Sequence, residues 1–132
     1  MKKIFVNGTF DIIHRGHIEL LYYAKSLGDY LTVAIDNDER VRQLKGDSRP
    51  INCLQDRMFL LQSLKPVDQV RSFGSDSGLE FWIRQSCSNI MVKGSDYKDK
   101  HIVGSDLVDE IIFYDIVNGY STTKTIQNII TR

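Results

Sequence analysis

Two histidines, His14 and His17, lie three positions apart and follow a Gly-Thr-Phe-Asp run at residues 8–11. Residues three apart on a helix lie on the same side of it, so both imidazoles can point at one group. A helix start also offers unpaired backbone N–H groups and the positive end of the helix dipole, which suit a phosphate. Gly16 keeps the space between the rings open, and Gly8 lets the backbone approach a ligand closely. These residues predict a phosphate-binding site at the start of a helix.

The same residues are also compatible with other roles. A single histidine near a helix start is more often structural than catalytic. Asp11, His14 and His17 could bind a metal ion, although such sites usually show more ligands in sequence. No Gly-x-Gly-x-x-Gly follows the first apolar run and no Gly-Lys-Ser/Thr occurs, so the sequence supports neither a dinucleotide dehydrogenase nor a P-loop ATPase. We expect phosphate binding and no metal held by the protein alone.

The elements that position these residues follow from the apolar pattern. Residues 4–6 form a short apolar run closed by Asn-Gly, typical of a buried parallel strand that ends in a turn. Apolar residues recur at helical spacing over 16–27, and Gly28 is placed to end this helix as its C′ residue. Residues 30–35 read as a second strand. The three elements form a strand-helix-strand unit with a right-handed crossover.

The same alternation continues along the chain. It predicts helices over 38–44, 54–64, 79–87 and from 122 onward, and strands over 67–73, 90–92 and 110–114, with 90–92 a central strand. Alternating strands and helices indicate one α/β domain over residues 1–132, a Rossmann-like doubly wound parallel sheet. The ligand site of such a sheet lies beyond the carboxyl ends of the strands, at a topological switch point.

Composition excludes several classes of partner. The 132 residues include 17 Lys+Arg and 17 Asp+Glu, a formal net charge of zero, so no wide basic surface is available for nucleic acid or an anionic membrane. No apolar run is long enough for a signal peptide or a membrane span, so we expect a cytoplasmic protein. Cys53 and Cys87 form no Cys-x-x-Cys pair, and we expect both to be buried, reduced thiols.

Three further segments carry polar residues where predicted elements begin or end. Residues 44–50 read Leu-Lys-Gly-Asp-Ser-Arg-Pro, and in isolation they could be a solvated turn. Residues 93–97 read Lys-Gly-Ser-Asp-Tyr, and they could form a tight turn or hold a base and ribose. Residues 121–123 read Ser-Thr-Thr, which suits a helix N-cap, an anion site, or both. His101 is expected to be an exposed loop residue.

Taken together, the segments at 8–17, 44–50, 92–97 and 119–123 resemble the nucleotidyltransferase superfamily that includes cytidylyltransferases and pantetheine-phosphate adenylyltransferase. The Lys-Gly-Asp-Ser-Arg-Pro and Lys-Gly-x-Asp-Tyr runs are more similar to the adenylyltransferase domain of ADP-heptose synthases than to glycerol-3-phosphate cytidylyltransferases. The latter carry an Arg where this chain has Ile116, which weakens the case for CTP.

The resemblance implies an activity. It is the transfer of AMP from ATP to a sugar 1-phosphate, with heptose 1-phosphate favoured, releasing pyrophosphate and forming an ADP-sugar. A CTP-dependent cytidylyltransferase for glycerol 3-phosphate and a nucleotide-binding module without chemistry are the alternatives. The resemblance further implies Mg²⁺ bound with the triphosphate and a homodimer. Because 132 residues leave no room for a sugar kinase, that kinase is expected to be a separate protein.

The resemblance also implies roles for individual residues. The two histidines would donate to the phosphates, with His17 closest to the α-phosphate, Lys45 and residues 121–123 would stabilise the leaving group, and Arg57 and Asp11 would place the acceptor. The implied catalytic residues are His14, His17, Lys45 and Asp11. The implied nucleotide-binding residues are Gly8, Thr9, Phe10, His14, Gly16, His17, Lys93, Gly94, Asp96, Tyr97, Ser121, Thr122 and Thr123. The implied substrate-binding residues are Asp11, Lys45, Arg49 and Arg57.

Overall fold

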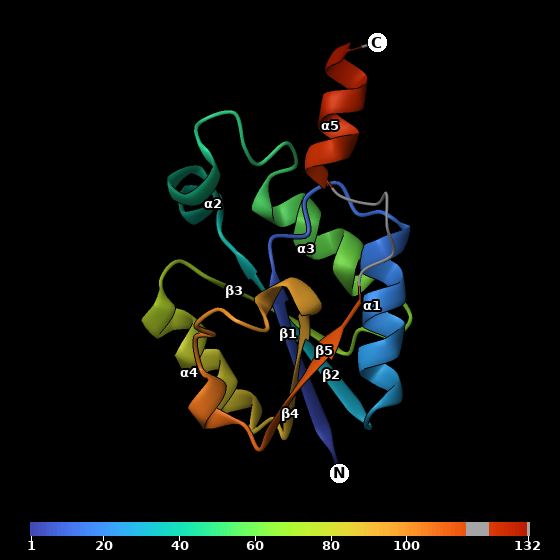
Figure 1. Ribbon diagram of the computed structural model, residues 1–132, viewed down its shortest axis with the longest axis vertical. Coiled ribbons are helices and arrows are strands. Elements are labelled where there is room, and N and C mark those ends of the chain that lie inside the picture. Colours follow the sequence, from blue (N-terminus) through green and yellow to red (C-terminus); the bar gives the residue numbers. More distant parts are fainter. Residues whose placement is uncertain (116–121, 132) are drawn as a thin grey trace.

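Five parallel strands form one sheet in the order β3-β2-β1-β4-β5 in the computed structural model, which describes residues 1–115 and 122–131 (Figure 1). The strands are β1 (Lys3–Gly8), β2 (Tyr30–Asp36), β3 (Gln69–Phe73), β4 (Ile90–Gly94) and β5 (Glu110–Tyr114). The helices are α1 (Arg15–Ser26), α2 (Asp38–Lys45), α3 (Leu54–Gln62), α4 (Asp76–Ser86) and α5 (Thr122–Thr131). This is the Rossmann-like α/β architecture that the sequence predicts.

Both faces of the sheet are covered, because successive side chains of a strand point to opposite faces. Ile4 and Val6 of β1 belong to the apolar cluster that Leu21 of α1 and Leu61 of α3 complete. Phe5, between them, belongs to the cluster on the opposite face, under α4. Burial on both faces explains why β1 reads as a continuous apolar run rather than an alternating one.

The switch point lies between β1 and β4. The chain builds β2 and β3 on one side of β1 and then returns to place β4 and β5 on the other side. The strand predicted over 90–92 is therefore an interior strand beside the central β1. β1 and β4 pair only at Ile4 with Ile90 and at Phe5 with Met91, although β1 continues to Gly8 and β4 to Gly94. Their carboxyl ends diverge, which opens the sheet where a ligand site is expected.

Gly28 follows α1 as predicted, but a left-handed backbone conformation is not what requires a glycine there. Leu27 is the C-cap, and Gly28 is absent from the glycines that have positive φ in the described residues. A Cβ at Gly28 would lie 2.7 Å from the backbone oxygen of Lys2, which is closer than real Cβ atoms approach other atoms. Glycine is thus required by the close approach of the N-terminal strand.

The expectation of buried thiols is wrong. Cys53 and Cys87 are both free and exposed. Cys53 is the N-cap of α3, and Cys87 ends α4 in the left-handed region with φ 50°. Helix ends lie at the surface of the layer that covers the sheet, so these positions leave both thiols in solvent.

Arg57 is fully buried, and its surroundings contradict the predicted contact with an acceptor phosphate. Its Nη1 donates to the backbone oxygens of Thr9 (3.0 Å) and Asp36 (2.8 Å). Its Nε donates to the backbone oxygen of Asn52 at 3.0 Å, and its Nη2 pairs with Asp38 Oδ1 at 2.7 Å. Arg57 therefore fastens the segments after β1 and β2 to the start of α3, and so holds the walls of the site together.

We expect Arg57→Met to lower the free energy of unfolding by about 3–5 kcal/mol, because it removes the fully buried member of a partly buried ion pair and leaves buried carbonyls without donors. Urea unfolding measures this. Arg84→Met is the matched control, since Arg84 pairs with Glu80 in an exposed position and such pairs contribute about 0–1 kcal/mol. Equal losses in the two variants would contradict the structural role.

Candidate functional site

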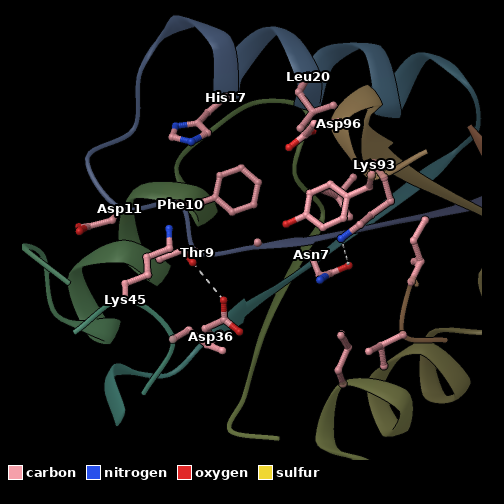
Figure 2. Close-up of a pocket in the computed structure, with 18 of the residues that line it drawn as sticks. Asn7, Thr9, Phe10, Asp11, His17, Leu20, Asp36, Lys45, Lys93 and Asp96 are labelled. Carbon is pink, nitrogen blue, oxygen red and sulfur yellow. Dashed lines mark hydrogen bonds between the residues drawn. The ribbon is translucent and has the colours of Figure 1, made fainter. Parts of the chain in front are cut away.

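A pocket of about 480 Å³ opens at the carboxyl ends of β1, β2 and β4, at the switch point (Figure 2). Most of the site residues predicted from sequence line it: Gly8, Thr9, Phe10, Asp11, His14, Gly16, His17, Lys45, Arg49, Lys93, Gly94, Asp96, Tyr97 and Thr123. Ser121, Ile116 and the side chain of Thr122 lie outside the described residues. Arg57 lies behind the pocket wall. The structure thus gathers residues from four separate segments at one place.

The two histidines cap α1 with their own rings. His14 Nδ1 accepts the backbone N–H of Gly16 at 3.1 Å, and His17 Nδ1 accepts the backbone N–H of His14 at 3.2 Å. The rings stack with centroids 3.9 Å apart and planes 20° from parallel. A neutral imidazole that accepts at Nδ1 carries its proton on Nε2. Each ring is therefore fixed as a hydrogen-bond donor through Nε2.

Electrostatics keep this pair neutral before a ligand binds. Burial, together with the charges of His14 and Lys45, lowers the pKa of His17 to about 4, and the charge of Asp11 opposes this effect. Burial also lowers the pKa of His14. Lys45 lies exposed at the rim, where partial desolvation of its ammonium and the charge of Arg49 lower its pKa. Cationic and donor groups thus face one another across the pocket, which is an arrangement that a bound anion stabilises.

The loop between β1 and α1 is held in an uncommon conformation. Phe10 and Ile12 have φ of 52° and 49°, in the left-handed region that non-glycine residues seldom adopt. The Phe10 ring is buried, and a Cβ at Gly8 would lie 3.0 Å from it. The same ring contacts His17, with centroids 5.1 Å apart. Gly8, predicted to let a ligand approach, makes room for Phe10, which in turn supports the ring of His17.

Asp11 is almost completely buried in the wall of the pocket. Its Oδ2 accepts the backbone N–H of Ile51 at 2.7 Å, and its Oδ1 accepts that of Asn52 at 2.9 Å. Both oxygens therefore hold the segment that follows Arg49, which makes Asp11 a positioning residue. Because a carboxylate has about four lone-pair positions and Asp11 also lines the pocket, its contact with the acceptor stays a prediction.

Arg49, unlike Arg57, lines the pocket. Its Nε lies 3.6 Å from Asp11 Oδ2, too far for a hydrogen bond, and its Nη1 lies 3.5 Å from Thr123 Oγ1. Its Nε and Nη2 are buried and have no hydrogen-bond partner in the described part of the chain. Buried donors without an acceptor are costly, and a phosphate oxygen would satisfy them. The substrate-binding role predicted for Arg49 fits this position.

The β4 flank offers a different surface. Lys93 is buried, its Nζ donates to Asn7 Oδ1 at 3.4 Å, and it lies 4.3 Å from the centroid of the Tyr97 ring. Burial lowers the pKa of Lys93, and Asp36 and Asp96 oppose that effect. Figure 2 shows Asp96 and Lys93 on the same side of the pocket as Leu20 of α1. An aromatic ring, apolar contacts and a carboxylate together suit a base and its ribose.

Sequence reasoning missed Asp36 and Arg40, which line the pocket from the β2 side. The available signal was the position of Asp36 directly after the strand predicted over 30–35, at the edge where the other site residues gather. His101 is exposed, as predicted, and also lines the pocket. Among the described residues, no three His, Cys, Asp or Glu side chains lie where they could hold a metal ion. Within 1–115 and 122–131 no helix is long and apolar enough to cross a membrane.

Comparisons with known proteins agree with this geometry. The sequence model of the Cytidylyltransferase-like family matches residues 5–128. The bifunctional protein HldE of Sulfurimonas denitrificans is 45% identical over 97% of this chain, and that of Helicobacter pylori is 44% identical over the same share. This chain spans only 27% of the length of either relative. A lipopolysaccharide core biosynthesis protein from Thermoplasma volcanium superposes with a TM-score of 0.72 at 27% identity, over 89% of this chain and 99% of that one.

The lowered pKa of His17 predicts a pH-dependent stability. Between about pH 4 and 6.5 the unfolded chain binds more protons at this residue than the folded chain does, so the free energy of unfolding rises with pH there. The gain is complete above pH 6.5 and is lost as the pH falls toward 4, with a size on the order of 3 kcal/mol.

Urea unfolding of wild type and His17→Gln at several pH values measures this contribution. The glutamine keeps an acceptor for the helix cap but does not titrate. The profile of the variant should be flatter than that of the wild type across this window. Two parallel profiles would show that His17 keeps an ordinary pKa in the folded protein.

Proposed function

The chain belongs to the cytidylyltransferase-like family of nucleotidyltransferases, as its motifs predicted, and we propose that it transfers AMP from ATP to a sugar 1-phosphate. An oxygen of the acceptor phosphate attacks the α-phosphorus of ATP and forms a new P–O bond. The bond from the α-phosphorus to the oxygen that bridges it to the β-phosphate breaks, pyrophosphate leaves, and an ADP-sugar remains. The acceptor phosphate is already ionised, so the step requires no proton transfer.

The observation that carries this proposal is the fixed orientation of the two imidazoles. Their Nδ1 atoms accept backbone N–H groups, and their Nε2 atoms carry protons, so neither ring can act as a general base. Both rings can donate hydrogen bonds to a phosphate as charge develops on it. Such a site suits a nucleophile that needs no deprotonation. A phosphate is a nucleophile of this kind, whereas an alcohol must lose its proton.

The roles of the individual residues in this reaction follow from their positions in the pocket. We propose that His17 and His14 bind the α-phosphate, and that Lys45 and residues 121–123 stabilise the leaving pyrophosphate. Arg49 supplies the unsatisfied guanidinium donors for a phosphate. Asp96, Gly94 and Tyr97 would bind the base and ribose on the β4 flank. Mg²⁺ would arrive on the phosphates of the nucleotide and reduce their negative charge.

The choice of ATP and of a sugar acceptor is supported by similarity rather than by a contact. The Lys-Gly-Asp-Ser-Arg-Pro run at 45–50 and the Lys-Gly-Ser-Asp-Tyr run at 93–97 resemble those of ADP-heptose synthases, so heptose 1-phosphate is the acceptor that we propose. The similar lipopolysaccharide core protein is also concerned with a sugar-containing product. A sugar kinase reaction would supply the acceptor, and we propose that the enzyme acts as a cytoplasmic homodimer.

Pyrophosphate release by the purified protein tests this function. ATP, CTP, GTP and UTP are crossed with heptose 1-phosphate and glycerol 3-phosphate in the presence of Mg²⁺. Release with ATP and heptose 1-phosphate alone supports the proposal. Release with CTP and glycerol 3-phosphate alone would make the enzyme a cytidylyltransferase, and nucleotide binding without release for any pair would indicate a module without chemistry.

We expect His17→Ala to lower kcat by about a hundredfold or more and to change the dissociation constant of ATP little, because the lost donor acts mainly on the transition state. Pyrophosphate release gives kcat, and calorimetry gives the affinity for ATP. Arg15→Ala is a matched control, because Arg15 begins the same helix but is exposed and does not line the pocket. Near-normal turnover of His17→Ala would refute the role of His17.

A further inference from the structure

We propose that Asp36 selects the acceptor by accepting hydrogen bonds from the hydroxyl groups of its sugar. The inference rests on the proposed function, since it assigns the acceptor to the β2 side of the same pocket. Asp36 is the last residue of β2, and its carboxylate is mostly buried at the floor of the pocket. Figure 2 shows it on the side of Thr9 away from Leu20 and Asp96, where we place the nucleotide.

The carboxylate is held in place by two donors. Thr9 Oγ1 donates to Oδ2 at 3.1 Å, and Arg40 Nε donates to Oδ1 at 3.1 Å. A carboxylate has about four lone-pair positions and accepts hydrogen bonds without donating any. The hydrogen bonds from Thr9 and Arg40 leave Asp36 able to accept further hydrogen bonds from a ligand, and Asp36 lines the cavity where that ligand would lie.

A carboxylate is unexpected in a pocket that binds phosphates, so the presence of Asp36 requires an explanation. It repels the phosphate groups of both substrates, and Lys45 and Lys93 are close enough for its charge to raise their pKa values. Sugar hydroxyls are the neutral donors that a carboxylate can bind without that repulsion. We therefore place the phosphate oxygens next to the cationic side chains of the pocket and the sugar hydroxyl groups next to Asp36.

The wall beside Asp36 fits the remaining surface of a sugar. Phe73 at the end of β3 and Leu79 of α4 line the pocket next to it, and Ile102 and Val103 line the same cavity. Phe73 pairs with Asp36 in the register of β2 and β3, so the two residues are neighbours. Apolar walls with a few placed polar groups are typical of small-molecule sites, and the C–H faces of a sugar pack on such walls.

The binding of two probes to the wild type and Asp36→Asn tests the inference without any need for turnover. Heptose 1-phosphate carries hydroxyl groups, and methyl phosphate has a phosphate but none. Removing a negative charge from the pocket should tighten the binding of any phosphate that Asp36 merely repels. Loss of hydrogen bonds to a charged group should instead weaken heptose 1-phosphate by about tenfold or more.

We therefore expect Asp36→Asn to weaken heptose 1-phosphate about tenfold while methyl phosphate binds as well as before or better. Asp76→Asn is the matched control, because Asp76 pairs with Arg40 at 2.6 Å but is exposed and does not line the pocket. It should leave both affinities unchanged. Equal tightening of both probes in Asp36→Asn would overturn the inference, as would weaker binding of ATP alone, which would place the ribose at Asp36.

Deoxy analogues of heptose 1-phosphate provide a test on the wild type, which stays decisive if Asp36→Asn fails to fold. At least one analogue should bind about tenfold more weakly than the parent sugar, because it leaves the buried carboxylate without its donor. Equal affinity for all analogues, or for methyl phosphate and the parent sugar, would overturn the inference. Absence of pyrophosphate release with every substrate pair, by contrast, would overturn the proposed function.

Discussion

Two backbone N–H groups at the start of α1 determine how the site works. A helix start leaves its first N–H groups without partners inside the helix, and a serine or aspartate side chain usually accepts one of them. Here imidazole nitrogens do so, at His14 and His17. Capping thereby sets the tautomer of both rings, stacks them, and makes each a donor through Nε2. The side chains that cap the helix are therefore the same ones that we propose to bind a phosphate.

The charged residues around this helix start separate into those that hold the walls and those that face the cavity. Arg57 and Asp11 are buried, and their hydrogen bonds to backbone groups hold the surrounding segments together. Arg57 also pairs with Asp38, and Asp11 lines the cavity as well. Arg49, Lys45 and Lys93 line the cavity. Fixing the loops with buried ions lets the cavity keep its cations close together before a ligand arrives. Preorganised charge of this kind stabilises a transition state without reorganisation during the reaction.

The sequence predicted the order of the elements and most of the cavity, because apolar runs and short motifs report local structure. It could not separate Arg49 from Arg57, since both are arginines in the same region and only the path of the chain decides which one faces a ligand. Gly28 was placed correctly, but the close approach that requires it involves Lys2, far away in sequence. Asp36 was missed because it reads as the polar end of a buried strand, and its neighbours come from other strands.

The account depends most directly on the tautomers of the two histidines, which ¹⁵N NMR of the imidazole nitrogens at pH 7 reports. With the two residues assigned by single substitution, both rings should show a protonated Nε2 and an unprotonated Nδ1, and neither should carry a positive charge in the free protein. A proton on Nδ1 of either ring would contradict the account, because that nitrogen could no longer accept the helix N–H and Nε2 would be a base rather than a donor.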